Sequence, residues 1–339
     1  MKLPGWAVPV GQAEQVRQEL RARDLLAPGV RWLHEGGEVV MPLRLVPTPS
    51  PWVGRLVERE FGPAERGNPR SYTEFMTGLS PEIREQLPRA FDVVGDIVLV
   101  RIPRELEALS EPIGQALLRF VPGARVVAAD LGVHGPERRR SLRRVAGDGG
   151  FSTVHRENGL AIEVDLEAAY FSPRLSREHA RVAGAVRAGE RLLDLCCGVG
   201  PFTLLAARQG RAHAIVAVDG NPAAIALLRR NLERLRSTVA VEPILAEASE
   251  FLLEPRVFDR AILNLPMDGA RFLPALGSHV RPGGAVHYFE VVERADRPGF
   301  GERVAAALGE GWRAGEERTV HAYSPRSDLV GLTISRTAD

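Results

Sequence analysis

The sequence predicts an α/β fold, with a doubly wound parallel sheet in its second half and smaller α/β units before it. Two observations predict this fold. A short apolar run, 191–193, leads into a turn that contains glycine and then into helix-forming residues over 203–208. A second apolar run, 214–218, ends at Asp219, about 20 residues beyond the first glycine of the turn. The order strand, turn, helix, strand is typical of one half of a nucleotide-binding sheet.

The turn itself favours S-adenosyl-L-methionine (AdoMet) over a dinucleotide. Gly198 and Gly200 stand in it, but Thr203 occupies the place of the third glycine that a dinucleotide site needs for close helix packing. Asp194 ends the first strand, and a carboxylate there repels phosphate but suits a cation. AdoMet carries an ammonium and a sulfonium group and no phosphate. We therefore expect a Rossmann-like, class I AdoMet domain, in which Asp219 accepts hydrogen bonds from ribose hydroxyls.

Composition places the chain among globular proteins of the cytoplasm. Hydrophobic residues make up 45% of the 339 residues, enough for two or three domains. The 44 basic and 43 acidic residues nearly balance, so any nucleic-acid surface has to be a local patch. Cys196 and Cys197 are the only cysteines, and adjacent cysteines cannot form an ordinary disulfide, which fits a reducing compartment. No apolar run is long enough to span a membrane, and no metal-ligand spacing is present.

Proline-rich and polar stretches mark the expected domain boundaries. A proline cluster from Pro47 to Pro51 suits a linker, because it fixes the backbone and lacks hydrogen-bond donors. The expected segments are a small α/β domain at 1–50, a linker and helical segment at 51–90, a second α/β domain at 91–178 and the AdoMet domain at 179–339.

The elements before the AdoMet domain follow from apolar spacing and capping residues. Apolar residues at helical spacing predict a helix over 12–23, and an apolar run predicts a strand over 38–45. Ser80, followed by a proline, starts another helix. The run 92–102 reads as one strand in which Gly95 marks a bulge. Further on we expect a helix over 112–120, a strand over 124–129 and two strands around a polar turn within 154–164.

An arginine-rich stretch, 135–144, holds five arginines within seven positions. A solvated turn is one explanation. Phosphate contact is favoured, because like charges at this density are costly unless an anion approaches them.

The helix that precedes the AdoMet turn is expected to begin at Ser176, acting as its N-cap. Glu178 lies in the first turn of this helix, where the helix dipole favours a negative charge. Without further information, this interaction with the helix dipole is the favoured reason for an acidic residue at position 178.

Beyond Asp219 the strand and helix pattern continues to the end of the chain. Asn221 and Pro222 cap and start a helix that reaches about Leu235. The expected strands are 239–244, 260–263 and 285–292, followed by an antiparallel edge made of 319–323 and 329–335.

The triplet from Asn264 to Pro266 is the best candidate for holding a substrate. The asparagine offers both a donor and an acceptor to the edge of a nucleobase, and the proline stiffens the turn. Its place at the carboxyl end of a strand is where ligands bind in open α/β sheets. A simple turn that ends a strand is the alternative. Cys196 and Cys197 lie in the cofactor turn, so packing is favoured for them over a role as nucleophile.

Taken together, these motifs resemble one known family over residues 90–335, the archaeal and eukaryotic type of tRNA (guanine-37) N(1)-methyltransferase. The matching stretches are His155 to Gly159, Tyr170 to Leu175, Glu178, Asp194 to Phe202, Asp219 to Pro222, Asn264 to Pro266 and Gly283 to Tyr288.

The resemblance implies methyl transfer from AdoMet to nitrogen 1 of guanosine 37 in the tRNA anticodon loop. We expect the protein to be a monomer without an obligatory protein partner. It implies that Tyr170, Arg174, Glu178 and Asn264 surround the target guanine, that Glu178 is the general base and that Arg138 assists. The residues expected to bind the cofactor are Arg174, Asp194, Cys196, Gly198, Gly200, Asp219, Asn221, Glu247 and Asn264.

Two departures and two alternatives accompany this resemblance. The family often has phenylalanine and alanine where Cys196 and Cys197 stand, and an aspartate near Ala246, where this chain offers only Glu247. The alternatives are an aminocarboxypropyl transferase of the wybutosine pathway and a non-catalytic RNA-binding protein with a vestigial AdoMet fold. The intact polar set that includes Glu178 and Asp219 speaks against the second alternative.

Overall fold

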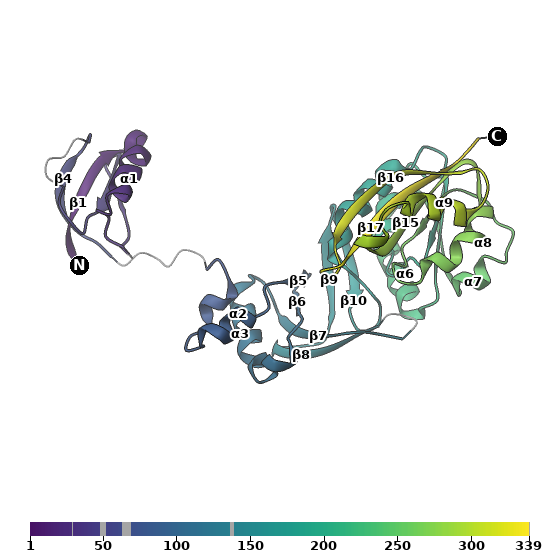
Figure 1. Ribbon diagram of the computed structural model, residues 1–339, viewed down its shortest axis with the longest axis horizontal. Helices are drawn as coiled ribbons and strands as arrows, with labels where there is room; N and C mark the ends of the chain where they lie inside the picture. Colours follow the sequence, from purple (N-terminus) through teal and green to yellow (C-terminus); the bar gives the residue numbers. More distant parts are fainter. Residues whose placement is uncertain (29, 48–51, 63–68, 136–138, 339) are drawn as a thin grey trace. The chain divides into compact units, whose positions relative to one another are not determined.

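The chain divides into two compact units, Met1–Glu74 and Phe75–Asp339 (Figure 1). The computed structural model describes residues 1–28, 30–47, 52–62, 69–135 and 139–338. The first unit extends past the expected boundary at residue 50. The expected boundaries near 90 and 178 lie within the second unit.

The first unit is a four-stranded sheet with one helix. Its strand order is β2-β3-β1-β4, and every neighbouring pair is antiparallel. The expected helix and strand near the chain start are present, but Arg55–Glu60, expected within a polar helical segment, is an edge strand. Charged residues suit an edge strand, because one of its sides faces water. The elements are β1 Lys2–Pro9, α1 Ala13–Ala22, β2 Leu33–Glu35, β3 Glu38–Pro42 and β4 Arg55–Glu60.

The second unit begins with a short helix and a four-stranded sheet of order β5-β6-β7-β8. The expected helix start at Ser80 is confirmed, since its side chain accepts a hydrogen bond from the backbone N–H of Ile83. The expected bulged strand over 92–102 is instead a hairpin, and Gly95, with φ of +57°, makes its turn. The elements are α2 Pro81–Gln86, β5 Phe91–Val94, β6 Ile97–Val100, α3 Ser110–Phe120, β7 Val126–His134 and β8 Arg139–Gly147.

A second hairpin and a helix lead into the large sheet. The hairpin joins β9 Ser152–Glu157 to β10 Leu160–Asp165, as expected. A one-turn 3-10 helix, Pro173–Leu175, then continues into α4, Ser176–Ala185. Ser176 is not the N-cap that we expected. Ser172 caps the 3-10 turn instead, by accepting a hydrogen bond from the backbone N–H of Arg174, and α4 simply continues that turn.

The large sheet has seven strands in the order β13-β12-β11-β14-β15-β17-β16. Its first five strands are parallel, while β17 is antiparallel to both of its neighbours. This confirms the expected doubly wound sheet with an antiparallel edge. The strands are β11 Arg191–Leu195, β12 Ala214–Asp219, β13 Ala240–Leu245, β14 Phe258–Leu263, β15 Val280–Glu293, β16 Trp312–Ala322 and β17 Ser327–Arg336.

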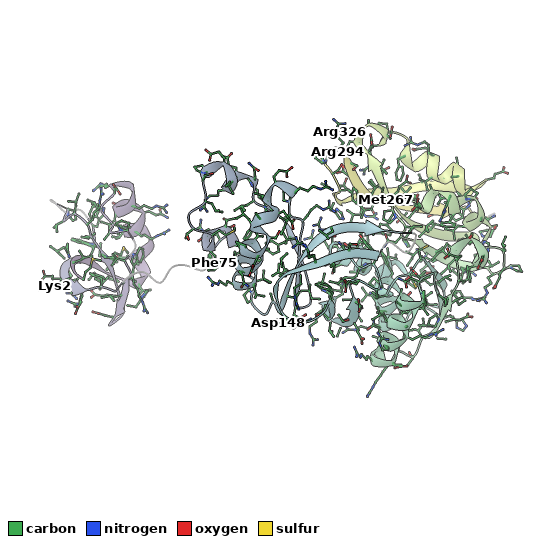
Figure 2. All side chains as sticks on the ribbon, turned by 90° about the horizontal axis from the view of Figure 1, so that it is seen from below. Lys2, Phe75, Asp148, Met267, Arg294 and Arg326 are labelled. Atoms are coloured by element: carbon green, nitrogen blue, oxygen red, sulfur yellow. The ribbon has the colours of Figure 1, made fainter. Side chains whose placement is uncertain are left out.

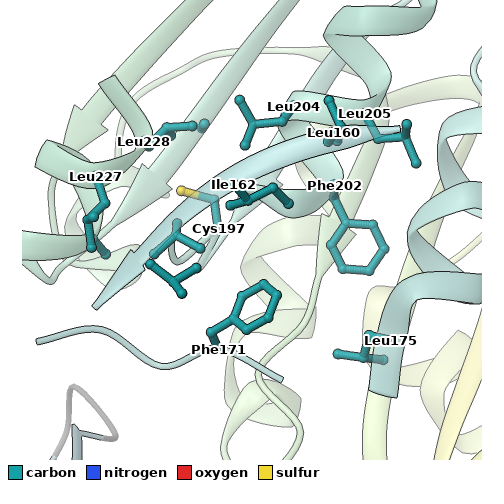
Figure 3. Close-up of a cluster of buried hydrophobic side chains, with 14 of the residues drawn as sticks. Leu160, Ile162, Phe171, Leu175, Cys197, Phe202, Leu204, Leu205, Leu227 and Leu228 are labelled. Carbon is teal, nitrogen blue, oxygen red and sulfur yellow. The ribbon is translucent and has the colours of Figure 1, made fainter. Parts of the chain in front are cut away.

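Helices cover the large sheet, and buried apolar residues form two separate clusters. Figure 3 shows the first cluster, in which Leu160 and Ile162 of the β9–β10 hairpin lie near Phe202 and Leu228. Within the described residues, no helix is long and apolar enough to cross a bilayer. The helices of this part are α5 Pro201–Gln209, α6 Pro222–Leu235, α7 Ala248–Phe251, α8 Leu273–Ser278 and α9 Phe300–Leu308.

Candidate active site

A cavity opens where strands β11, β12, β13 and β14 of the large sheet end, as open α/β sheets lead one to expect. Five short segments line it, each following a strand or preceding α4. The lining segments are 170–172, 196–199, 218–221, 246–248 and 264–266, joined by Leu175, His179, Pro201, Arg271 and Phe272.

The glycine turn after β11 has the backbone that its sequence predicts. Gly198 and Gly200 both have positive φ, of +57° and +83°. A Cβ atom on Gly200 would lie 2.4 Å from Cδ1 of Leu228, so a larger residue would require the Leu228 side chain to move. The positive φ of Gly200 is itself a backbone shape that favours glycine at this position.

Asp219, at the end of β12, ties the glycine turn to the next one. Its carboxylate accepts hydrogen bonds from the backbone N–H groups of Gly198, at 2.7 Å, and Asn221, at 2.9 Å. Asn221 caps α6 through the N–H of Ala223 and donates its amide to the backbone oxygen of Ala168. Both residues line the cavity.

Asp194 lies behind the glycine turn rather than on the cavity wall. It is fully buried, and its Oδ2 accepts hydrogen bonds from Thr203 Oγ1, at 2.6 Å, and from the Thr203 N–H. Burial raises the pKa of this carboxyl group to about 7; the Thr203 hydrogen bonds oppose the rise, and the charge of Asp219 adds to it. Asp194 is not among the residues that line the cavity, so a direct contact between it and the cofactor stays a prediction.

The remaining cofactor-side residues pack closely around the cavity. Cys196 and Cys197 both line it, and burial raises their thiol pKa values, to about 12 for Cys196, so both are neutral thiols. This fits the packing role that we expected. Glu247 also lines the cavity, and its Oε1 would lie 2.6 Å from a Cβ atom on Gly220, which places it beside the Asp219 turn.

Asn264 presents an unsatisfied acceptor to the cavity. Its Oδ1 is buried and has no hydrogen-bond partner among the described atoms. The turn is fixed from behind, because Pro266 accepts a hydrogen bond from the N–H of Val291. The chain then reaches the surface at Met267, which is 54% exposed (Figure 2). A rigid turn with a free amide oxygen is suited to holding the N–H edge of a base.

The residues expected around the target guanine are only partly brought together. Tyr170 lines the cavity, and the guanidinium of Arg140 lies 5.2 Å from its ring centre. Arg174 is exposed and pairs with Asp92 at 2.7 Å. Arg138 falls outside the described residues.

Glu178 is buried, but it faces two arginines instead of the cavity lining. Its Oε2 accepts hydrogen bonds from Arg181 Nε at 2.8 Å and from Arg318 Nη2 at 3.3 Å. Arg318 comes from β16, and no signal in the sequence linked it to Glu178. The next residue, His179, does line the cavity. No sequence signal singled out His179, because the histidines are scattered along the chain.

The arginine-rich stretch forms strand β8 more than a turn, and acidic residues neutralise part of it. Arg140 pairs with Asp130 at 2.5 Å, and Arg143 pairs with Glu107. Asp130 lies on the neighbouring strand β7 and Glu107 lies just before α3, so part of the arginine charge in this stretch is paired within the protein. Arg144 is exposed and donates to the backbone oxygen of Gly149.

The chain matches known proteins over almost its whole length. The TRM5/TYW2 methyltransferase domain matches residues 153–304, and the TYW2 N-terminal domain matches residues 73–150. The tRNA (guanine(37)-N(1))-methyltransferase Trm5b of Pyrococcus abyssi is 33% identical over 331 residues, which cover 96% of each chain. Its counterpart from Methanocaldococcus jannaschii is 29% identical and covers 94% of each chain.

Solved structures agree with these matches. The crystal structure of Trm5b from Pyrococcus abyssi superposes with a TM-score of 0.80 at 29% identity, covering 99% of each chain. A complex of aTrm5 with tRNALeu superposes with a TM-score of 0.76 at 28% identity, covering 98% of this chain and 99% of that one. The chain therefore belongs to the tRNA (guanine-37) N(1)-methyltransferase family, within the group that carries the TRM5/TYW2 methyltransferase domain.

Proposed function

We propose that the protein transfers the methyl group of AdoMet to nitrogen 1 of guanosine 37 in the anticodon loop of tRNA. The observation that carries this proposal is the cavity that joins the glycine turn and Asp219 to the unsatisfied Oδ1 of Asn264. In such a cavity, the carboxylate of Asp219 can bind ribose hydroxyls, and Oδ1 of Asn264 can accept a hydrogen bond from the edge of a base. Proteins that bear this activity in their names match the chain end to end.

AdoMet supplies an electrophilic methyl group on its sulfonium when it is bound. The residues of the chain then have to hold the guanine and remove its N1 proton, because the N1 lone pair is otherwise unavailable. We propose that Asn264 and Tyr170 hold the base, that Arg174 stabilises negative charge on the guanine oxygen, and that Glu178 takes the proton. Arg138 is proposed to assist Arg174.

The cofactor is proposed to lie on the glycine turn. Asp219 and Glu247 are proposed to bind its nucleoside hydroxyls and base, and Cys196 is proposed to pack against the nucleoside; all three line the cavity. Gly198, Gly200 and Asn221 shape the turn, and Asp194 supplies a charge behind it. Arg174 and Asn264 complete the proposed set at the substrate end.

The experiment that tests the function is nucleoside mapping by mass spectrometry. Transfer RNA transcripts are incubated with the enzyme and AdoMet, and a transcript with adenosine at position 37 is the matched control. We expect a single methyl group on guanosine 37 and no product with the control. An aminocarboxypropyl group at this position would instead support the second candidate activity, which the match of residues 73–150 to a TYW2 domain motivates. Absence of both products would contradict the proposal.

We also propose that residues 91–178 position the RNA and that the protein works as a monomer in the cytoplasm. Light scattering on the protein as it elutes from a size-exclusion column measures its mass in solution. A mass of about 37.0 kDa is the expected result, and twice that mass would contradict the monomer.

Replacing Asp219 by alanine should weaken AdoMet binding by roughly 1.5–3 kcal/mol. A pair of ribose hydroxyls would lose an ionised acceptor, and the Gly198 N–H would lose its partner. Calorimetry measures the affinity, with Glu242→Ala, an acid on the neighbouring strand β13 outside the cavity lining, as the matched control. Unchanged affinity in the Asp219 variant would remove Asp219 from the cofactor site.

Replacing Arg143 and Arg144 by glutamine should weaken tRNA binding and flatten its salt dependence by about one unit of slope per lost phosphate contact. The exposed pair Arg229 and Arg313, replaced in the same way, controls for net charge. Affinities measured over a series of salt concentrations give both slopes. Equal slopes for the two double variants would mean that the β8 arginines are solvated only.

A further inference from the structure

His179 is a buried imidazole on the cavity wall for which the proposed reaction has no role. It lies in the first turn of α4, is 1% exposed, and lines the cavity. Its ring packs against the side chain of Phe202 in an edge-to-face arrangement, with ring centres 4.5 Å apart. Phe202 directly follows Pro201 at the start of α5, so His179 is anchored beside the glycine turn.

A buried carboxylate fixes the orientation of this ring. Glu157, the last residue of β9, has its Oε1 2.6 Å from His179 Nδ1. Burial opposes ionisation of Glu157, but the neighbouring imidazoles of His155 and His179 lower its pKa to about 2. An ionised carboxylate only accepts hydrogen bonds, so Nδ1 of His179 carries a hydrogen.

His155 supports Glu157 from its other side. The Nδ1 of His155 accepts a hydrogen bond from the N–H of Gly95 at 3.3 Å, which leaves the hydrogen on Nε2. That Nε2 lies 3.7 Å from Oε2 of Glu157. The imidazoles of His155 and His179 therefore both lie beside the Glu157 carboxylate. Glu157 holds His179 in the tautomer with the hydrogen on Nδ1.

When the ring carries only this one hydrogen, Nε2 of His179 has a free lone pair. The Nε2 atom is buried and has no hydrogen-bond partner among the described atoms. Asn264 Oδ1 is the other unsatisfied acceptor on the same cavity wall. Because buried polar atoms in folded proteins are almost always satisfied, two unsatisfied acceptors on one cavity indicate that bound ligands supply their donors.

We propose that Nε2 of His179 accepts a hydrogen bond from an N–H donor of a ligand in this cavity, with Glu157 as its positioning residue. This inference rests on the proposed function, which offers two donors of that kind. One is the α-ammonium group of AdoMet. The other is the N1–H edge of the target guanine, in which case His179 holds the edge that loses the proton.

Calorimetry on the full chain separates the two donors. The probes are AdoMet and 5′-methylthioadenosine, which shares the nucleoside and sulfur but lacks the amino-acid part. The variants are His179→Asn and His179→Gln, because the asparagine amide reaches about as far as Nδ1 and the glutamine amide about as far as Nε2. If the ammonium is the donor, His179→Asn should weaken AdoMet about 10- to 100-fold, His179→Gln should weaken it less, and methylthioadenosine should bind both variants as it binds the wild type.

The guanine is tested by single-turnover methylation of tRNA at saturating AdoMet. If the base is the donor, His179→Asn should lower the rate about 10- to 100-fold with AdoMet affinity unchanged, and His179→Gln should restore part of it. Equal losses for AdoMet and methylthioadenosine, or no change in either assay, would overturn the proposal. Wild-type protein that does not bind AdoMet would instead overturn the proposed function, so the two failures are distinguishable.

A spectroscopic readout tests the geometry without any ligand. Nitrogen chemical shifts of the His179 ring at pH 8 should show a neutral ring with its hydrogen on Nδ1. Glu157→Gln should mix the two tautomers, since a neutral amide can donate as well as accept. A doubly protonated ring, or one with its hydrogen on Nε2, would overturn the proposal. Thermal unfolding of each variant confirms that the compared proteins are folded.

Discussion

Replacing Glu178 by glutamine should lower the single-turnover rate of tRNA methylation by on the order of 10²–10⁴-fold, the usual contribution of a general base. The change keeps the shape of the side chain but removes its ability to take the N1 proton. AdoMet affinity should stay near that of the wild type, because Glu178 is not among the described residues that line the cavity.

The structure adds a requirement to this role. Both oxygens of Glu178 accept hydrogen bonds from arginines, Oε2 from Arg181 and both from Arg318. To reach the guanine, the side chain has to turn away from them when RNA binds. Arg177→Gln, an exposed change one residue away, is the matched control and should keep the wild-type rate. A Glu178 variant that methylates tRNA nearly as fast as that control would leave the residue a structural partner of Arg181 and Arg318.

Replacing Asp194 by asparagine should change how stability depends on pH. The pKa of this buried carboxyl group is about 7 in the folded protein, against an ordinary value of 3.8. The folded state therefore holds this proton more tightly than the unfolded chain. Its contribution to stability is fully present below about pH 4 and is lost as the pH rises through 7, by on the order of 4 kcal/mol. Asp194→Asn should abolish that loss, because an amide does not ionise.

Urea unfolding of both proteins between pH 4 and pH 8 measures this difference directly. Thr203→Val is the comparison variant, because it removes the hydroxyl that donates to Oδ2 and should extend the decline to higher pH. Binding of cationic AdoMet favours the ionised form of Asp194, so proton release should accompany binding near pH 7. Calorimetry in two buffers with different ionisation enthalpies measures it. Parallel stability curves for wild type and Asp194→Asn would show that Asp194 does not titrate in this range.

The fold could be predicted wherever a local sequence signal decides local structure. Gly198, Gly200 and the Asn221 cap each need one backbone shape, and each has it. The hairpin around Gly95 was wrongly predicted as one strand, because β6 is buried along its whole length and continues the apolar run of β5. Gly95, with its positive φ, makes the turn between the two strands. A β-bulge can also contain a glycine with positive φ, so this residue did not distinguish a hairpin from a bulged strand.

The site could be predicted at the level of segments, but not at the level of single side chains. Residues after β11, β12 and β14 do converge, because parallel strands end at one edge of the sheet. Which side chains face the cavity depends on the direction in which each one leaves the backbone. Asp194 points behind the turn, and Glu178 and His179 point to different partners although they are adjacent on α4. The acids that pair with Arg140 and Arg143 come from the neighbouring strand β7 and from the segment before α3, and no local pattern reveals them.

The position of β17 in the sheet has a consequence for biosynthesis. This strand, Ser327–Arg336, is made after β15 and β16, yet it lies between them and pairs with both. A ribosome therefore completes both neighbours before the strand that joins them has left the exit tunnel. Until then the nascent chain carries two open strand edges, which invite pairing with other chains. A stop codon that removes little more than these ten residues would leave the newborn protein permanently in that aggregation-prone state.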